Sequence, residues 1–511
     1  MSLTVDLEAL RWKLVPVLLA FLSWRLLQHY RTKQRYIDNV PIAGGRENIQ
    51  QNRQRFTTDS LSILRNAYEE YNGSLFYVPT PIGERLMLPS KYLDEIKSAD
   101  MKVVDFQGTF LEMFEGAYTT LGTHSRLLPE VVRAQLNQHM AHVIPEIQAE
   151  IRESLDELFP PCKDWTEINL SETMAIIIAR VSSRMFGGTA LSRNREWIAK
   201  SLEFAHNGFA AAQKLKRWPA ALKPLAVHLV PEIRAIRRSY RVARDTIVPL
   251  LEAAAAQEDP ESRPNNLLTW MYTQAKGPEK DMEFIAGTVL KVSFAAYHTS
   301  AAAPTQLLFD LAAAPEHAAP LVAEYEAAAR GADGNVTTKG FAQMVKMDSI
   351  MKESQRFNPL LLITFERIMR RDFPLHDGVV IPANTWVGVP AQAITMDPAL
   401  YPEPDEFRAF RFVAPAAGSE SDGDGNVNDN DKKSGGRGGS SSSSKSVSPQ
   451  AQFASAHPGS MMFGYGQHAC PGRFFATMEI KGIIGEVARR VTFDTQHLPS
   501  PEGRVMFKAR G

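Results

Sequence analysis

Cysteine is scarce in this chain: only Cys162 and Cys470 occur among 511 residues. Two cysteines cannot build the disulfide framework of a small secreted domain, nor a structural zinc site with four cysteine ligands. We therefore expect two reduced thiols, as on the cytosolic side of a membrane. Net charge is also lacking, since 57 Lys and Arg balance 57 Asp and Glu. This balance argues against a nucleic-acid partner.

Internal repeats and Gly-rich nucleotide-binding fingerprints are absent as well, so no flavin or dinucleotide domain is evident. The composition, 44% hydrophobic and 22% charged, is that of a globular chain with a large core. At about 150 residues per domain the length would allow three domains, but large single enzyme domains also reach this size.

Long hydrophobic runs are missing too. Leu14 to Leu22 is unbroken apolar, and the stretch extends to Leu27 with one arginine, about 14 residues against the roughly 20 that cross a bilayer. A marginal span and a monotopic anchor both fit, and a buried helix of a soluble fold is the alternative. The basic segment HYRTKQRY follows without a cleavage site, which favours a membrane anchor at 1–35 with the remainder cytosolic.

The composition changes abruptly over residues 414–460, which are acidic, Gly-rich and nearly free of apolar side chains, with five consecutive serines at 440–444. Such a stretch cannot bury enough area to offset the entropy of ordering it. We interpret it as a disordered insertion in a single domain at 36–511.

Helical periodicity, with apolar residues three and four apart, dominates residues 130–357. A hairpin-like segment follows at 374–391, PLHDGVVIPANTWVGVPA, punctuated by Gly378 and Pro382. The expected fold class is therefore mainly α with a minor β-sheet region.

The most specific motif is FGYGQHACPGRFFA at 463–476. Its skeleton, F-x-x-G-x-x-x-C-x-G, arises by chance in roughly 4 of 10,000 chains of this composition. Gly464, Gly466 and Gly472 permit left-handed turns and close backbone approach to a flat group, and Phe463 supplies an apolar wall.

Cys470 precedes a helix, whose N-terminal amides and dipole stabilise a thiolate. Pro471 has no N–H, so the donors come from Gly472 onward. A thiolate sheltered in this way suits a soft metal centre such as haem iron. An inert buried cysteine in a Gly-rich turn is the alternative.

Position by position, this stretch resembles the haem-binding signature of the cytochrome P450 family. The resemblance implies haem b with Cys470 as the axial iron ligand, held in a loop that includes Phe463, Gly466 and Gly472. His468, where many members carry Arg, would contact a haem propionate. The family's Trp and Arg pair on the first propionate-binding helix is not recognisable. Arg133 is a substitute candidate, with a solvated helix charge as the alternative.

Glu353 and Arg356 in KESQRFNP stand three residues apart and share one helix face. The same spacing recurs elsewhere in the chain and usually means a solvated pair. Here PDEFRAFRF follows and resembles the family's P-x-x-F…R-F segment. The resemblance implies that Glu353, Arg356 and Arg411 form a buried structural network that holds the cysteine loop.

AAYHTS, Ala295–Ser300, resembles the family's central helix motif, small-small-x-acid-Thr. The resemblance makes Thr299 the proton-delivering residue, and a threonine bonded back to a helix carbonyl is the alternative. His298 stands where an acid is usual, so it becomes a second catalytic candidate with an altered relay. Pro304 predicts a kink around Ser300.

Four segments most resemble fungal microsomal P450s of secondary metabolism, including those that oxidise gibberellin precursors and indole diterpenes. They are HTS, ESQRFNP, DPALYPEPDEF and the cysteine motif. Residues 214–238 resemble the substrate-access region of that group. As chemistry, this apolar and basic stretch suits an anionic membrane surface, and an ordinary amphipathic packing helix is the alternative.

The resemblance implies a haem-thiolate monooxygenase in the endoplasmic reticulum membrane with a cytosolic catalytic domain. It would oxidise a lipophilic secondary metabolite, with a terpenoid favoured, using O2 and NADPH electrons. A separate NADPH-cytochrome P450 reductase would dock near Cys470, on a face with Arg473 and Lys481. The alternatives are a P450-type isomerase, desaturase or ring-expansion enzyme on a polyketide or alkaloid, and a non-catalytic membrane haem protein.

Overall fold

The computed structural model describes residues 35–122, 125–259, 262–330, 334–413, 449–493 and 504–510, together with Ser23. The anchor expected at 1–35 therefore lies outside the described residues, apart from Ser23 and Arg35, as does the part of the insertion at 414–448. None of the helices in the described part of the chain has both the length and the apolar character that a membrane crossing requires.

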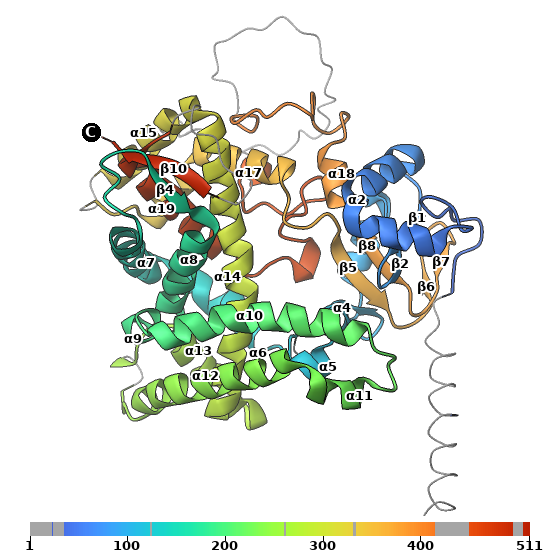
Figure 1. Cartoon of the computed structure of the whole chain (residues 1–511), viewed down its shortest axis with the longest axis horizontal. Coiled ribbons are helices and arrows are strands. Elements are labelled where there is room, and N and C mark those ends of the chain that lie inside the picture. The colour runs from blue at the N-terminus through green and yellow to red at the C-terminus, as the bar shows by residue number, and fades with distance from the viewer. Residues whose placement is uncertain are drawn as a thin grey trace, which may run out of the picture.

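Helices make up most of the described chain, as expected, and all of the longest except α2, which packs on β1, lie together in one bundle (Figure 1). The long helices are α2 (Ile49–Tyr71), α7 (Asn137–Leu158), α8 (Leu170–Gly187), α10 (Arg195–Lys216), α12 (Pro231–Ala255), α14 (Met282–Ala313) and α19 (Arg473–Arg490). Central among them is α14, which contacts α8, α10, α12, α17 and α19.

Shorter helices connect and cover the bundle. They are α3 (Leu93–Lys97), α4 (Phe106–Met113), α5 (Gly116–Thr119), α6 (Leu127–Val131), α9 (Thr189–Ser192), α11 (Lys223–Ala226), α13 (Leu267–Gln274), α15 (Ala318–Ala329), α16 (Thr338–Gln343), α17 (Val345–Phe357) and α18 (Ala391–Thr395). A π-helical turn, Val132–Leu136, joins α6 to α7.

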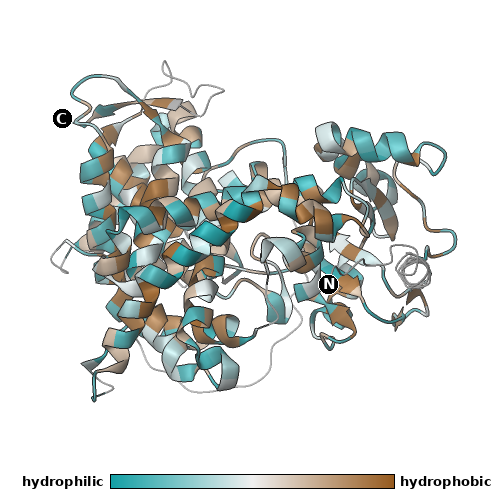
Figure 2. Ribbon diagram, turned by 60° about the horizontal axis from the view of Figure 1, so that its bottom comes forward, coloured by the Kyte–Doolittle hydropathy of each residue, from teal (hydrophilic) through white to brown (hydrophobic). Residues whose placement is uncertain are grey.

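Local sequence explains where the long helices begin. The side chains of Asn169, Asn194 and Asp281 accept backbone N–H groups at the first turns of α8, α10 and α14. Most residues of α14 are apolar, which suits a helix surrounded by others. In Figure 2 hydrophilic and hydrophobic residues alternate along the helices, as amphipathic helices require.

The minor sheets are antiparallel except for one pair. The largest has the order β1-β2-β8-β5-β3, in which β2 and β8 are parallel. Its strands are β1 (Phe76–Thr80), β2 (Gly83–Met87), β8 (Trp386–Val389), β5 (Thr364–Met369) and β3 (Val104–Asp105). A three-stranded sheet joins β4 (Thr166–Asn169), β10 (Arg504–Ala509) and β9 (Val491–Thr492). The hairpin expected at 374–391 contains β6 (Phe373–Pro374), β7 (Val380–Ile381) and β8.

The C-terminal end of the predicted insertion differs from the expectation. Phe453 is 1% exposed, and its backbone N–H donates to the carboxylate of Asp348 on α17 (3.1 Å). Lys352 of the same helix donates to Ser455 (3.0 Å). Placing residues 449–460 in the insertion was therefore wrong, because α17 supplies them with burial and polar partners that composition does not reveal.

Candidate active site

The segment that carries Cys470 is a tight loop before α19. The Cys470 N–H donates to the Phe463 carbonyl (2.7 Å), which closes the loop. Gly464 and Gly466 have φ of +74° and +73°, so both take the expected left-handed conformation. Gly472 instead caps α19 with φ −88°, where any residue fits, so the expected left-handed role of Gly472 is wrong.

The Cys470 sulfur lies where a thiolate receives partial compensation. Burial raises the pKa of Cys470, while backbone N–H groups of Gly472 and Arg473 and the Arg473 charge lower it. The donors expected beyond Pro471 are therefore in place. A bound metal ion would favour the thiolate against this cost of burial.

Gly466 also allows a close approach between the cysteine loop and α3. A Cβ atom at this position would lie 2.6 Å from the Cβ of Lys97. Lys97 donates to the hydroxyl of Tyr465 (3.2 Å), whose own hydroxyl donates to Asp94 (2.8 Å). The glycine is therefore required twice, for its φ and for this contact.

His468 lies in a cationic group of side chains. Its ring stacks on Phe106 (5.0 Å between centroids), and its Nε2 atom is buried with no hydrogen-bond partner among the described residues. Burial lowers the pKa of His468 to about 4, with smaller contributions from the charges of Arg367, Arg133 and Arg126. An unpaired nitrogen beside three guanidinium groups marks a place for an anionic group.

Arg133 belongs to this group through an irregular turn. It lies in the π-helical turn before α7, a kind of turn often found at functional sites. Its Nη2 donates to the carbonyl of Gln467, beside His468 (2.9 Å). The structure thus places Arg133 against the cysteine loop, while the residue itself stays exposed.

Arg367 on β5 is a site candidate that the sequence reasoning missed. Its side chain is 2% exposed and pairs with no carboxylate among the described residues, and burial lowers its pKa to about 9. The guanidinium lies over the rings of Phe106 (4.5 Å) and Phe365 (4.4 Å). An unpaired buried cation is costly. The segment ERIMRR holds three arginines, and only burial distinguishes this one.

Together these residues fit haem, a flat apolar group with an iron atom and two carboxylates. Cys470 offers the thiolate, the glycines allow backbone approach, and Arg133, Arg367 and His468 offer donors for propionates.

Glu353 forms the centre of a second buried group. Its carboxylate is fully buried and accepts two bonds from Arg356 (both 2.9 Å) and two from Arg411 (both 3.1 Å). Arg356 also donates to the carbonyls of Thr395 (3.0 Å) and Pro404 (2.7 Å). The structure therefore brings the three network residues together, around the chain at 395–411.

This network reaches the cysteine loop indirectly. The hydroxyl of Tyr401, within the segment held by Arg356, donates to the carbonyl of Gly459 (2.8 Å). Phe453 then packs edge-to-face on Phe463, the first residue of the loop (5.3 Å).

His298 and Thr299 lie on an exposed face of α14. Thr299 donates to the Ala295 carbonyl (2.7 Å), the back-bond named as its alternative. Surrounding protein lowers the pKa of His298, and His206 adds to this, so its imidazole is neutral near pH 7. α14 remains one helix from Met282 to Ala313 with Pro304 inside it. Pro304 therefore does not end the helix.

Aromatic rings lie beside these two residues. Phe114 contacts Phe209 (5.3 Å) and Phe294 (5.5 Å), and Phe209 contacts His298 edge-to-face (6.5 Å). Phe209 is 42% exposed, so this aromatic cluster offers accessible apolar surface next to Thr299.

Lys481 does not lie on a docking face, contrary to expectation. It is 2% exposed, pairs with Asp348 (2.8 Å) and donates to the Phe341 carbonyl (2.8 Å). Its position on α19 points into the bundle, which the sequence spacing did not show. Arg473 is partly buried and donates to the Cys470 carbonyl (2.9 Å).

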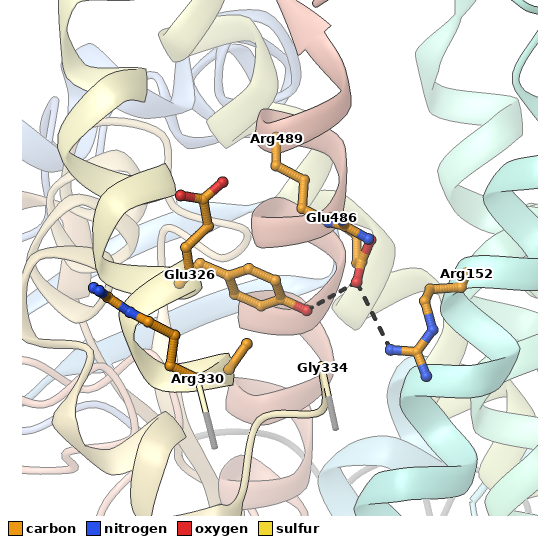
Figure 3. Close-up of a pocket in the computed structure, with 8 residues that line it drawn as sticks. Arg152, Glu326, Arg330, Gly334, Glu486 and Arg489 are labelled. Atoms are coloured by element: carbon orange, nitrogen blue, oxygen red, sulfur yellow. Dashed lines mark hydrogen bonds and ion pairs between the residues drawn. The ribbon is translucent and has the colours of Figure 1, made fainter. Parts of the chain in front are cut away.

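A hollow of about 430 Å³ lies between α7, α15 and α19, and none of the candidate site residues lines it (Figure 3). It is lined by Arg152, Tyr325, Glu326, Ala329, Arg330, Gly334, Glu486 and Arg489. Glu486 pairs with Arg489 (2.6 Å) and accepts a hydrogen bond from Tyr325 (3.2 Å). The carboxylate in the wall of the hollow therefore already has partners.

The buried network generates a stability prediction. Glu353→Ala strands two buried guanidinium groups, and we expect the free energy of unfolding to fall by about 3–5 kcal/mol. Chemical denaturation measures it. Glu69→Ala is the control, because its pair with Arg65 is exposed and should contribute little. Equal effects of the two variants would contradict the prediction.

Comparison with known proteins agrees with this geometry. The cytochrome P450 family model matches residues 123–508. The cytochrome P450 monooxygenase braC of Annulohypoxylon truncatum is 30% identical over 94% of this chain and 95% of its own. An ent-kaurene oxidase, P450-4 of Gibberella fujikuroi, is 29% identical over 92% of each chain. The chain therefore belongs to the cytochrome P450 family of monooxygenases, whose cofactor is haem with an axial cysteine thiolate.

Proposed function

We propose that the chain inserts one oxygen atom of O2 into a lipophilic secondary metabolite, with Cys470 as the iron ligand. The observation that carries this proposal is the Cys470 sulfur, which receives two backbone amides in a loop beside the unpartnered Nε2 of His468 and near the buried Arg367. Haem with a thiolate ligand supplies O2 cleavage when bound. Arg133, Arg367 and His468 would orient it by holding its propionates.

A terpenoid is the favoured substrate class. The aromatic cluster of Phe114, Phe209 and Phe294 lies beside Thr299 and offers apolar area that a lipophilic substrate can bury. The similarity to ent-kaurene oxidases supports this choice.

Thr299 is the proposed proton-delivering group. Its hydroxyl now bonds back to Ala295, and rotation about χ1 would free it to donate outward. His298 next to it is neutral near pH 7 and can accept or pass a proton without first losing one.

Electrons would come from NADPH through a separate reductase that docks on the face near Cys470. Phe474 at the start of α19 is 38% exposed, and the Arg473 guanidinium lies over its ring (4.4 Å). An apolar side chain beside a cation fits a partner with an acidic surface.

The proposed location is the endoplasmic reticulum membrane, with residues 1–35 as anchor and the catalytic domain cytosolic. Around α11, exposed apolar residues form a membrane-facing patch: Trp218, Leu222, Leu225 and Leu229, of which the last two are 70% and 72% exposed. Arg217 in the same segment is exposed and suits an anionic headgroup, whereas Lys214 and Lys223 pair with Glu232 and Glu115.

The ligand assignment is tested by the spectrum of the reduced protein with carbon monoxide. We expect the red-shifted Soret band typical of thiolate ligation in the wild type and in Cys162→Ser, whose thiol is buried far along the chain from the loop. Cys470→Ser should lose this band. An unaltered band in Cys470→Ser would overturn the assignment.

The reaction is tested with labelled O2, NADPH and added reductase. We expect one labelled oxygen in the product, and a fall of about 100-fold in coupled product formation in Thr299→Ala. Thr299→Ser keeps the hydroxyl and should retain most of it. Unchanged turnover in Thr299→Ala, with no label in the product, would instead indicate an isomerase or desaturase type of reaction.

The membrane-facing patch is tested on the full chain in anionic vesicles. We expect hydrogen exchange at residues 218–229 to slow on reconstitution, and the double variant Leu225→Asp, Leu229→Asp to lose this protection. Leu400→Asp, at an exposed leucine outside the patch, should keep it. Equal exchange with and without vesicles would contradict the proposal.

A further inference from the structure

The turn of α14 that carries Thr299 has a buried polar side as well as an exposed one. Tyr297 and Ser300 stand three residues apart, on one face, and are 1% and 7% exposed. The Tyr297 hydroxyl shares a hydrogen bond with Ser183 of α8 (2.7 Å), which also accepts from the indole of Trp197 on α10 (2.9 Å). Polar contacts therefore fix this face against two other helices.

Glu479 of α19 lies in the same polar layer. Its side chain is 1% exposed, and Oε1 accepts a hydrogen bond from Ser182 of α8 (3.0 Å). The Ser300 hydroxyl lowers the pKa of the same carboxyl. Oε2 of Glu479 nevertheless makes no hydrogen bond within the described part of the chain. No described Lys, Arg or His pairs with it, so nothing in the structure compensates a charge at this place.

The surroundings of Glu479 favour its neutral form. Burial raises the pKa of Glu479 to about 8, against smaller opposing effects of Ser182 and Ser300. The titratable group that faces it is the Tyr297 phenol, whose pKa burial also raises. α19 also packs against α7, α15 and α16, and no charge on these helices contributes to the shift. Glu479 is therefore a carboxylic acid near pH 7.

We propose that Glu479, as a neutral acid, is a positioning residue that sets the rotation of α14 at the Thr299 turn. Tyr297 and Ser300 face α8 and α19, while His298 and Thr299 face the opposite, exposed side. Fixing the buried face of a helix fixes the direction of the exposed one, because the residues share one rigid turn. Ionised Glu479 would instead be an unpaired buried charge that reorganises the layer.

This role matters more here because of two other features of the same helix. The residue before Thr299 is His298 and the residue after it is Ser300, so Thr299 has no carboxylate neighbour in sequence. Pro304 lacks an N–H, which leaves the Ser300 carbonyl without its helical donor and loosens this turn. The Ser300 side chain does not restore that bond, but its contact with Glu479 ties the same turn to α19.

The inference rests on the proposed monooxygenase function, but its first test does not need turnover. Infrared difference spectra of the wild type and Glu479→Gln, taken between pH 6 and 9, should show a protonated-carboxyl band that is lost with an apparent pKa near 8 and is absent from the variant. Glu324→Gln is the control, because burial also raises the pKa of Glu324 on α15, outside this layer.

Stability gives a second readout. The folded pKa lies above the unfolded value of about 4.3, so the folded state binds more protons between these two values. The contribution of Glu479 to the free energy of unfolding is therefore complete below pH 4.3 and falls as the pH rises toward 8. We expect this slope to be reduced in Glu479→Gln.

The third readout is coupling, the fraction of consumed NADPH that yields product. It tests whether ionisation of Glu479 affects Thr299. About half of the wild-type molecules are ionised at pH 8, so coupling should fall about twofold there relative to pH 6.5 and further at pH 9. Glu479→Gln, permanently neutral, should stay coupled across this range. A carboxyl already ionised at pH 6.5, or the same pH profile in both proteins, would overturn the inference. Loss of the thiolate band with carbon monoxide would instead count against the proposed function.

Discussion

The buried carboxylate of Glu353 between two guanidinium groups is the interaction on which the site depends. Arg356 and Arg411 compensate its charge, and their other N–H groups donate hydrogen bonds to carbonyls of residues 395–406. Removal of Glu353 would leave two guanidinium groups without a carboxylate inside the protein. Because Tyr401 and Phe453 connect this group to the loop, the position of Cys470 follows from an ion pair remote from it in sequence.

Charge is distributed unevenly around the site, and the imbalance explains its chemistry. On the loop side, the buried Arg367 has no carboxylate partner in the described part of the chain and the neutral His468 has an unpartnered Nε2, which suits the carboxylates of haem. Behind α14, Glu479 is buried without a cation and stays neutral. Both arrangements avoid the free-energy cost of an uncompensated buried charge. The buried Arg367 is suited to an external anion, whereas the buried Glu479 stays protonated.

Much of the site followed from local patterns. The turn at Gly464 and Gly466 and the helix after Cys470 depend on φ preferences and on spacing over a few residues, so the motif was sufficient to predict them. Glu353 and Arg356 are also local, being three apart on one helix. Their burial is not, and a resemblance was needed to separate them from pairs that remain in solvent.

The sequence by itself determined the helical class, the order of the motifs and the special position of Cys470, because each is written in short-range spacing and composition. Only the tertiary structure decided which charges are buried. Lys481 was expected on a docking face but pairs with Asp348, Arg367 was overlooked among three arginines, and residues after 449 pack where composition suggested disorder. Burial depends on which distant elements meet at a residue, and neighbours in sequence do not contain that information.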